Sequence, residues 1–199
     1  MEELQHCEIL KTNINVTNMS DTIKYIAGHL DDLRGKYICV SNVHTTVMSY
    51  ENEEYRKIQN GAAMALPDGA PLSSYSRRKG YKQAQRVTGP DLMLELFAIS
   101  KEKGYRHYFY GATEETLQSM KEVLERDYPG IQIAGMYAPP FRALTPQEDA
   151  QIVAKINEAR PDFIWIGLGA PKQEEWMYQH MGQLQGVLIG VGAGFDYLA

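Results

Sequence analysis

The sequence predicts an α/β fold with a mainly parallel sheet and helices on both faces. Short apolar runs rich in β-branched and aromatic residues alternate with longer amphipathic stretches, which is the pattern of strands joined by crossover helices. The central runs are continuously apolar, as expected for strands covered on both sides. The 199 residues contain no internal repeat and no linker-like segment, so we expect one domain over residues 1–199.

Six apolar runs are predicted to form this sheet, and two shorter runs before them are predicted to form a small N-terminal β-hairpin. The six runs are Tyr37–Ser41, Ala63–Leu66, His107–Tyr110, Ile131–Ala134, Phe163–Leu168 and Val187–Val191, and the hairpin runs are Glu8–Leu10 and Asn13–Val16.

Helix start signals lie between the predicted strands. Ser20 is a candidate N-cap for a helix that continues to Leu30, and Thr88 opens a helix that Gly104 closes. Thr113 and Thr145 are each followed by an acidic first turn, which indicates two further helix starts.

Composition narrows the functional classes. The net charge of −5 gives no electrostatic support for a nucleic-acid partner. Cys7 and Cys39 lack metal-type spacing and indicate buried free thiols in a reducing cytoplasm. The acidic N-terminus does not resemble a secretory signal, and no apolar run approaches the ~20 residues that span a bilayer. We therefore expect a cytoplasmic protein whose membrane contact, if present, is peripheral.

Asp68 is the first candidate functional residue, because Pro67-Asp68-Gly69 places a carboxylate directly after a predicted buried strand. Ligands of open α/β sheets bind beyond the carboxyl ends of the strands. One interpretation is a turn or a cap of the next helix. The other is a general base whose pKa is raised by partial burial. Spacing alone leaves both open.

The segment from Gly167 to Glu174 is the second candidate. Its glycines allow close backbone approach, and Pro171 is suited to the first turn of a helix. Lys172 and Gln173 would then lie at a helix N-terminus, where free N–H groups attract phosphate. The alternative for Lys172 is a solvated surface position.

Three weaker signals complete the set. Tyr110-Gly111-Ala112-Thr113 is another junction of strand, glycine and helix, which is also a common packing solution. Arg86 could supply a cation to a phosphate or form an exposed salt bridge. His44 follows a strand end, where a lone histidine is more often a hydrogen-bonded structural residue than a ligand or a catalyst.

Several familiar motifs are missing from the sequence. Neither glycine-rich loop matches a dinucleotide fingerprint, and there is no Walker P-loop, GxSxG elbow, HExxH or Asp-x-Asp pair. We therefore expect a site without metal or cofactor, in which protein cations neutralise phosphate.

These motifs together resemble the WecG/TagA/CpsF glycosyltransferases, and the chain is most similar to the TagA type. The matching segments, in order, are Pro67-Asp68-Gly69, Arg86–Asp91, Tyr110-Gly111-Ala112, Gly167–Glu174 and Gly190–Asp196. The resemblance implies a Rossmann-like single domain and an inverting, metal-independent transferase. It implies a UDP-sugar donor, often UDP-N-acetylmannosamine, and an undecaprenyl-diphosphate-linked acceptor. Such products enter teichoic acid, common antigen or capsule synthesis.

The resemblance also implies roles for individual residues. Asp68 would be the catalytic base, with Asn42 beside it as the second catalytic residue. The residues expected to bind substrate are His44, Arg86, Gly111, Gly169, Lys172, Gln173, Gly192, Gly194 and Asp196.

The resemblance also implies a basic C-terminal appendage that mediates contact with the inner membrane face, and we expect this chain to lack it. A homo-oligomer is compatible with the sequence. Two other functions stay open: a Rossmann-type sugar-nucleotide oxidoreductase or epimerase, and a non-catalytic nucleotide-sugar-binding module. Binding of UDP without NAD would separate the first of these from a transferase.

Overall fold

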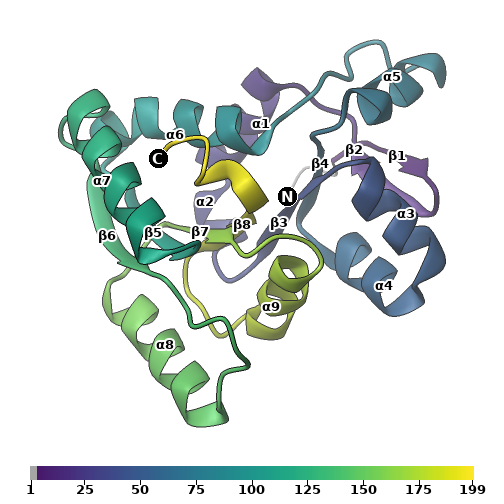
Figure 1. Ribbon diagram of the computed structural model, residues 1–199. Helices are drawn as coiled ribbons and strands as arrows, with labels where there is room; N and C mark the ends of the chain where they lie inside the picture. The colour runs from purple at the N-terminus through teal and green to yellow at the C-terminus, as the bar shows by residue number, and fades with distance from the viewer. Residues whose placement is uncertain (1–3) are drawn as a thin grey trace.

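The computed structural model describes residues 4–199, which fold around a six-stranded parallel sheet. The strands lie in the order β4-β3-β8-β7-β5-β6 (Figure 1). Their bounds are β3 Tyr37–Ser41, β4 Met64–Pro67, β5 Arg106–Gly111, β6 Gln132–Tyr137, β7 Phe163–Gly167 and β8 Val187–Gly190. The prediction of a parallel α/β sheet is confirmed, and every predicted strand is present within a few residues of its expected bounds.

Helices cover both faces of the sheet, as the continuously apolar strands require. On one face α1, α6 and α7 pack over Phe109, Trp165 and Ile189. On the other face α4, α8 and α9 pack over Cys39, Ile164 and Leu188. The bounds are α1 Met19–Gly28, α2 Leu30–Leu33, α3 Val43–Glu51, α4 Glu53–Gly61, α5 Ala70–Arg78, α6 Gly89–Lys103, α7 Glu114–Asp127, α8 Pro146–Glu158 and α9 Lys172–His180, with a 3₁₀ turn η1 at Gly192–Gly194.

Most of the predicted helix caps are confirmed. Thr88, Thr113 and Thr145 each accept a hydrogen bond from the backbone three residues on, and Gly104 ends α6 in the left-handed conformation. Ser20 was the wrong cap for the first helix. Asn18 caps α1 by accepting from the Asp21 amide, so the helix begins two residues earlier than predicted.

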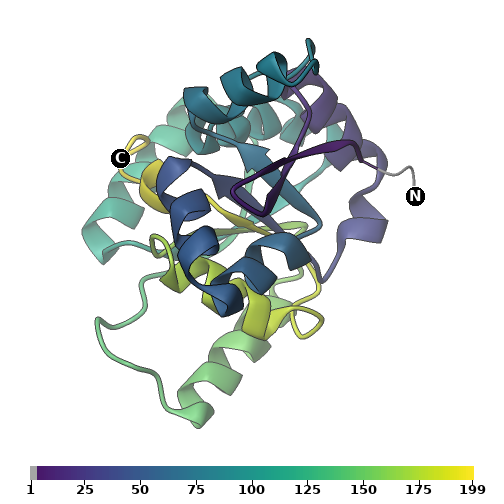
Figure 2. The same ribbon diagram turned by 90° about the vertical axis from the view of Figure 1, so that its right-hand side faces the viewer.

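The predicted N-terminal hairpin is formed by β1 His6–Ile9 and β2 Thr12–Asn15. It lies against β4, the edge strand on that side of the sheet (Figure 2). The Asn15 side chain accepts a hydrogen bond of 2.6 Å from the Ala65 amide. The hairpin therefore provides a hydrogen-bond acceptor for a backbone amide of the edge strand, which would otherwise be exposed. Across residues 4–199, every helix is too short or too polar to cross a bilayer.

Candidate functional site

The predicted site residues lie on the loops that follow the carboxyl ends of the strands. β5 leads to α7 on one face of the sheet, whereas its neighbour β7 leads to α9 on the other. Open parallel sheets bind ligands where neighbouring strands send their connections to opposite faces. The switch between β5 and β7 therefore marks a natural ligand position, and the ends of β8, β3 and β4 follow it along the same edge of the sheet.

Asp68 immediately follows β4, and its backbone amide donates to the Ser41 carbonyl of β3. The next helix, α5, has Gly69 as its N-cap and no capping side chain. Asp68 therefore does not cap α5, and the capping interpretation is wrong. Its side chain is 28% exposed, so one carboxylate is held at the strand end, partly shielded from water.

Arg86 is the partner of this carboxylate. Arg86 Nη2 lies 3.3 Å from Asp68 Oδ1, and Arg86 Nε donates to the Asp68 carbonyl oxygen. The Val87 amide also donates to the Pro67 carbonyl, which fixes the arginine beside β4. Burial raises the pKa of Asp68, and the Arg86 charge and hydrogen bond offset part of that rise. The result is a carboxylate that takes up a proton more readily than an exposed aspartate while staying oriented.

Asn42 lies beside the segment that follows β4, because β3 and β4 pair with Ser41 opposite Pro67 and the Asn42 backbone approaches Gly69. Asn42 is the N-cap of α3. Its side-chain Oδ1 accepts a hydrogen bond from the Thr45 backbone amide, and its backbone amide donates to Thr45 Oγ1. This capping box gives Asn42 a structural role whatever else it does. His44 is exposed in the first turn of α3.

Lys172 and Gln173 begin α9, as predicted, but their side chains lie in opposite environments. Lys172 is exposed at the helix N-terminus and forms no ion pair with any residue in 4–199. Gln173 is buried, and both ends of its amide are used. Its Oε1 accepts from the Gly192 amide at 2.9 Å, and its Nε2 donates to Glu174 Oε1 at 2.7 Å. Gln173 therefore ties α9 to the glycine-rich turn after β8, and its contact with a substrate stays a prediction.

Glu174 is a residue that the sequence analysis did not single out. It is fully buried, and burial raises the pKa of its carboxyl group, while the Gln173 hydrogen bond lowers it in part. A buried glutamate is rare unless it is bound to a partner. The sequence did contain a signal for Glu174, because it places a charged residue on the buried side of an otherwise amphipathic helix.

The predicted glycines divide into two groups. A side chain at Gly111 would lie 2.4 Å from the Gly167 carbonyl oxygen, and one at Gly194 would press on Val191 and Met93. Glycine is required there by packing. Gly169 has nothing within 4 Å of the position of a Cβ atom, and Gly192 meets only the end of Gln173 at 3.9 Å.

Of the predicted glycines, Gly169 and Gly192 therefore have open space beside the backbone, and the Gly192 amide is already bound to Gln173. Asp196 is exposed just beyond η1. Residues 4–199 bring together no group of three His, Cys, Asp or Glu side chains that could hold a metal ion.

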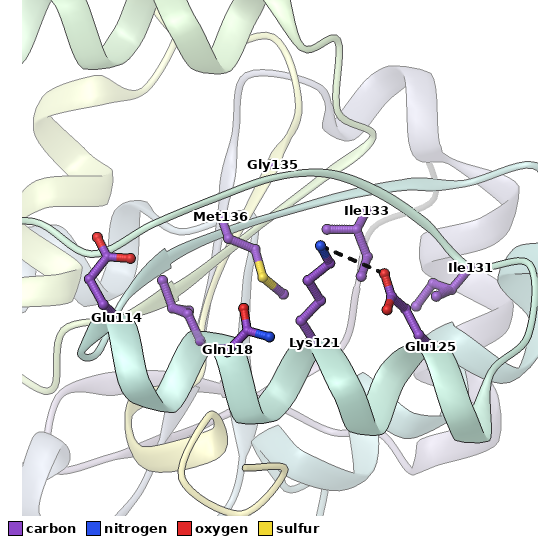
Figure 3. A pocket seen from close by; sticks show the side chains of 9 residues that line it. Glu114, Gln118, Lys121, Glu125, Ile131, Ile133, Gly135 and Met136 are labelled. Atoms are coloured by element: carbon purple, nitrogen blue, oxygen red, sulfur yellow. Dashed lines mark ion pairs between the residues drawn. The ribbon is translucent and has the colours of Figure 1, made fainter.

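A cavity of about 480 Å³ between α7 and β6 lies apart from all these residues (Figure 3). Its wall combines apolar side chains of β6, such as Ile133 and Met136, with Gln118 and the Lys121–Glu125 ion pair of α7. None of the predicted site residues lines it. It does not belong to the candidate site.

Comparisons with known proteins show what this chain is similar to. The model of the glycosyl transferase WecG/TagA/CpsF family matches residues 7–199. Among similar proteins are N-acetylglucosaminyldiphosphoundecaprenol N-acetyl-beta-D-mannosaminyltransferases of three bacteria. The Bacillus spizizenii protein is 31% identical over 84% of this chain and 64% of its own length. The Bacillus subtilis protein is 29% identical over 90% and 69%, and the Staphylococcus aureus protein is 26% identical over 96% and 75%. The chain thus spans a little under two thirds of the first of these relatives.

Proposed function

This chain belongs to the WecG/TagA/CpsF glycosyl transferase family, and from that membership we propose that it transfers N-acetylmannosamine from a UDP-sugar to a lipid-linked acceptor. The acceptor would be N-acetylglucosamine on undecaprenyl diphosphate, as the names of the relatives from Bacillus and Staphylococcus state for those proteins. The product would enter cell-envelope polymer synthesis.

The observation that carries the proposal is the half-buried Asp68 carboxylate beside Arg86. A glycosyl transfer needs a base that removes the proton of the attacking hydroxyl group. Partial burial raises the pKa of Asp68 and so strengthens it as a base, and Arg86 keeps its deprotonated form accessible. Asn42, at the end of the paired strand, would position the acceptor sugar next to it.

The donor diphosphate would lie at the N-terminus of α9. Lys172 forms no ion pair among residues 4–199, and the space beside Gly169 leaves room for phosphate oxygens at the start of α9. Lys172 and the helix N-terminus would neutralise the charge on the leaving UDP. We propose that this is sufficient without a metal ion or a cofactor.

The proposed step is a single displacement. Asp68 takes the proton of the acceptor hydroxyl as that oxygen bonds to the anomeric carbon, and the bond from this carbon to the UDP oxygen breaks. The electron pair leaves with UDP, so the configuration at the anomeric carbon inverts. Because the acceptor carries a lipid, we place the reaction at the inner face of the cell membrane, with the protein associated peripherally.

The test is to incubate the protein with separate UDP-sugars and a short-chain lipid-diphosphate-N-acetylglucosamine, and to read the product by mass. Transfer of one N-acetylhexosamine from UDP-N-acetylmannosamine, lost in Asp68→Asn, is the expected result. Binding of UDP with no product, in the wild type and on membranes alike, would identify a nucleotide-sugar-binding module. A change in the nucleotide sugar without any acceptor would identify the modifying enzyme considered above.

A further inference from the structure

The segment 69–90, which contains α5 and the turn after it, concentrates positive charge that the proposed mechanism mostly leaves unused. It holds five of the 20 lysine and arginine residues of the chain and none of its 25 acidic residues. The five cations, all of them exposed, are Arg77, Arg78, Lys79, Lys82 and Arg86. Because the whole chain has a net charge of −5, the rest of it is strongly acidic and this segment differs from its surroundings.

Three of these cations have side chains with neither an ion pair nor a hydrogen bond within residues 4–199. They are Arg78, Lys79 and Lys82. Lys79 Nζ lies 5.4 Å from the ring centroid of Tyr75, which is itself 38% exposed. Tyr75, Arg78 and Lys79 are three and four residues apart and therefore share one side of the end of α5. We call Tyr75, Arg78, Lys79 and Lys82 the basic face.

The segment is packed firmly onto the domain, so these charges have fixed positions. Leu72, on the inner side of α5, is buried against Cys7 and Ile9 of the hairpin. After the helix, Arg77 Nη1 donates to the Ala84 carbonyl oxygen at 2.7 Å and closes the turn. Figure 1 shows α5 at the outer edge of the molecule, next to β1 and β2. The basic face is therefore presented to solvent on a rigid support.

Both ends of the segment are tied to the candidate site. It starts directly after Asp68 and returns to Arg86, whose Nη2 lies 3.3 Å from the Asp68 carboxylate. Because α5 has nine residues, its far end lies roughly 14 Å from the start of the helix at about 1.5 Å per residue. A partner held by the basic face would thus lie about one short helix away from the proposed base.

The form of the basic face indicates a broad anionic partner. A site for a single phosphate gathers its donors around a pocket, whereas these three cations extend from a helix end and the following turn. The anionic surface of a bilayer attracts clusters of lysine and arginine. An exposed tyrosine suits the headgroup region, because its ring is apolar and its hydroxyl group is polar. The acidic remainder of the domain is repelled by the same surface, so attraction is restricted to this side.

We propose that the basic face docks the domain on the anionic surface of a lipid bilayer. The role of this docking in transfer rests on the proposed function, in which the acceptor is carried by a lipid. Docking at the end of α5 would hold Asp68 roughly 14 Å from the headgroups, the region where a lipid-linked diphosphate sugar is presented. The family resemblance implies membrane contact through a C-terminal segment, whereas the basic face belongs to the body of the domain.

The first experiment measures sedimentation of the protein with vesicles of phosphatidylcholine, and with vesicles of an equal mixture of phosphatidylcholine and phosphatidylglycerol. The protein should bind the mixed vesicles at low ionic strength, less so as salt is added, and should not bind phosphatidylcholine alone. A triple variant, Arg78→Gln with Lys79→Gln and Lys82→Gln, should lower the partition coefficient about 100-fold, since each cation contributes roughly fivefold. Inorganic pyrophosphate at constant ionic strength should not release the protein.

Two further variants show whether position or total charge matters. The matched control removes the same charge from exposed positions on α6 and α8 that also form no ion pair among the described residues. It combines Lys101→Gln, Lys103→Gln and Lys155→Gln, and it should bind the mixed vesicles like the wild type. A charge-conserving variant should retain binding as well. It combines Arg78→Lys, Lys79→Arg and Lys82→Arg. Thermal unfolding checks that every variant is folded.

Transfer assays separate this proposal from the proposed function. With a short-chain acceptor in solution the triple variant should keep the wild-type kcat/KM, whereas with a long-chain acceptor in mixed vesicles its rate should fall at least about tenfold. Vesicle binding that is lost in the triple variant, without transfer by any form, would support the docking surface and contradict the transferase. Equal vesicle binding by the wild type and the triple variant, an equal loss in the matched control, or release by pyrophosphate would overturn the docking surface and leave the transferase standing.

Discussion

Arg86 holds both the side chain and the main chain of Asp68: its Nη2 lies 3.3 Å from the carboxylate, and its Nε donates to the carbonyl oxygen of the same residue. One arginine therefore fixes the orientation of the proposed base and adjusts its proton affinity. From the sequence alone, Arg86 could be either a phosphate ligand or half of an exposed salt bridge. The structure contains the salt bridge and gives it a specific partner.

Asp68→Asn should lower turnover by about 10²–10⁴-fold, the range for loss of a general base. The mutant should be at least as stable as the wild type at neutral pH. Because burial raises the folded-state pKa of Asp68 above 3.8, ionised Asp68 costs folding free energy above that pH, and asparagine removes the cost. Turnover assays and thermal unfolding from pH 3 to pH 8 check both parts. Near-normal turnover would refute the assignment of the base.

Arg86→Gln should move the acidic limb of the pH profile of kcat/KM to higher pH. Arg86 lowers the pKa of Asp68, so its removal leaves the base protonated over a wider range. Arg78→Gln, an exposed change at the end of α5, is the control. An unmoved limb, together with a raised KM for the sugar donor at every pH, would instead place Arg86 on the diphosphate.

Glu174 should stabilise the candidate site through Gln173, which it holds against the turn at Gly192. Glu174→Gln should keep turnover and should not reduce stability, because the amide oxygen can still accept from Gln173 and no charge is buried. Glu174→Ala should cost about 1–3 kcal/mol in urea unfolding, since it leaves a buried amide group without its partner. It should also raise KM through the loosened Gly192 turn. Equal damage from both variants would mean that the carboxylate charge itself is required.

His107 predicts how stability depends on pH. It is fully buried on β5, with Trp165 donating to its Nδ1 and Ser100 bound at Nε2, and burial lowers its pKa to about 3. In the unfolded chain His107 takes up a proton near pH 6.5, whereas in the folded chain it stays neutral down to about pH 3. The free energy of unfolding therefore falls as the pH is lowered below 6.5. Between pH 6.5 and 5 the loss should be about 2 kcal/mol. Denaturant unfolding of the wild type and of His107→Gln checks this, and the same slope in both would exclude His107 as its source.

Activity should survive excess EDTA, because Lys172 and the N-terminus of α9 supply the positive charge at the proposed diphosphate position. Lys172→Met should then raise the KM for the sugar donor far more than it changes thermal unfolding, since Lys172 is exposed. Loss of activity in EDTA, restored by Mg²⁺ or Mn²⁺, would show that a metal ion carries this charge.

Much of the fold could be predicted because its signals are local. Continuous apolar runs such as Phe163–Gly167 occur only where both faces of a strand are covered, and Thr88 and Gly104 mark helix ends by their own chemistry. The first helix was misplaced because Asn18 and Ser20 are both good caps. Thr17 and Thr22 are hydrogen-bonded across the start of α1, a contact that follows from how the chain enters the helix.

The site could be predicted only in part, because its details depend on neighbours distant in sequence. The positions of Asp68 and Lys172 at the strand ends were predicted. That Asp68 binds Arg86 depends on the segment before α6 returning to β4. That Gln173 is buried depends on the turn after β8 lying against α9. Neither relationship leaves a pattern in the sequence.

The position of β8 has a consequence for how the protein is made. Among the described strands, β8 comes last in sequence but lies between β3 and β7, pairing Tyr37 with Leu188. Until β8 inserts, β4-β3 and β7-β5-β6 can form only two separate half-sheets, each with an open edge. Strand pairs between segments far apart in sequence form slowly. Strand edges that stay unpaired in the meantime can pair with other chains and lead to aggregation. Because Asp68 belongs to one half and Lys172 to the other, the folding chain should assemble the proposed substrate site in a single late step, when β8 joins the two halves.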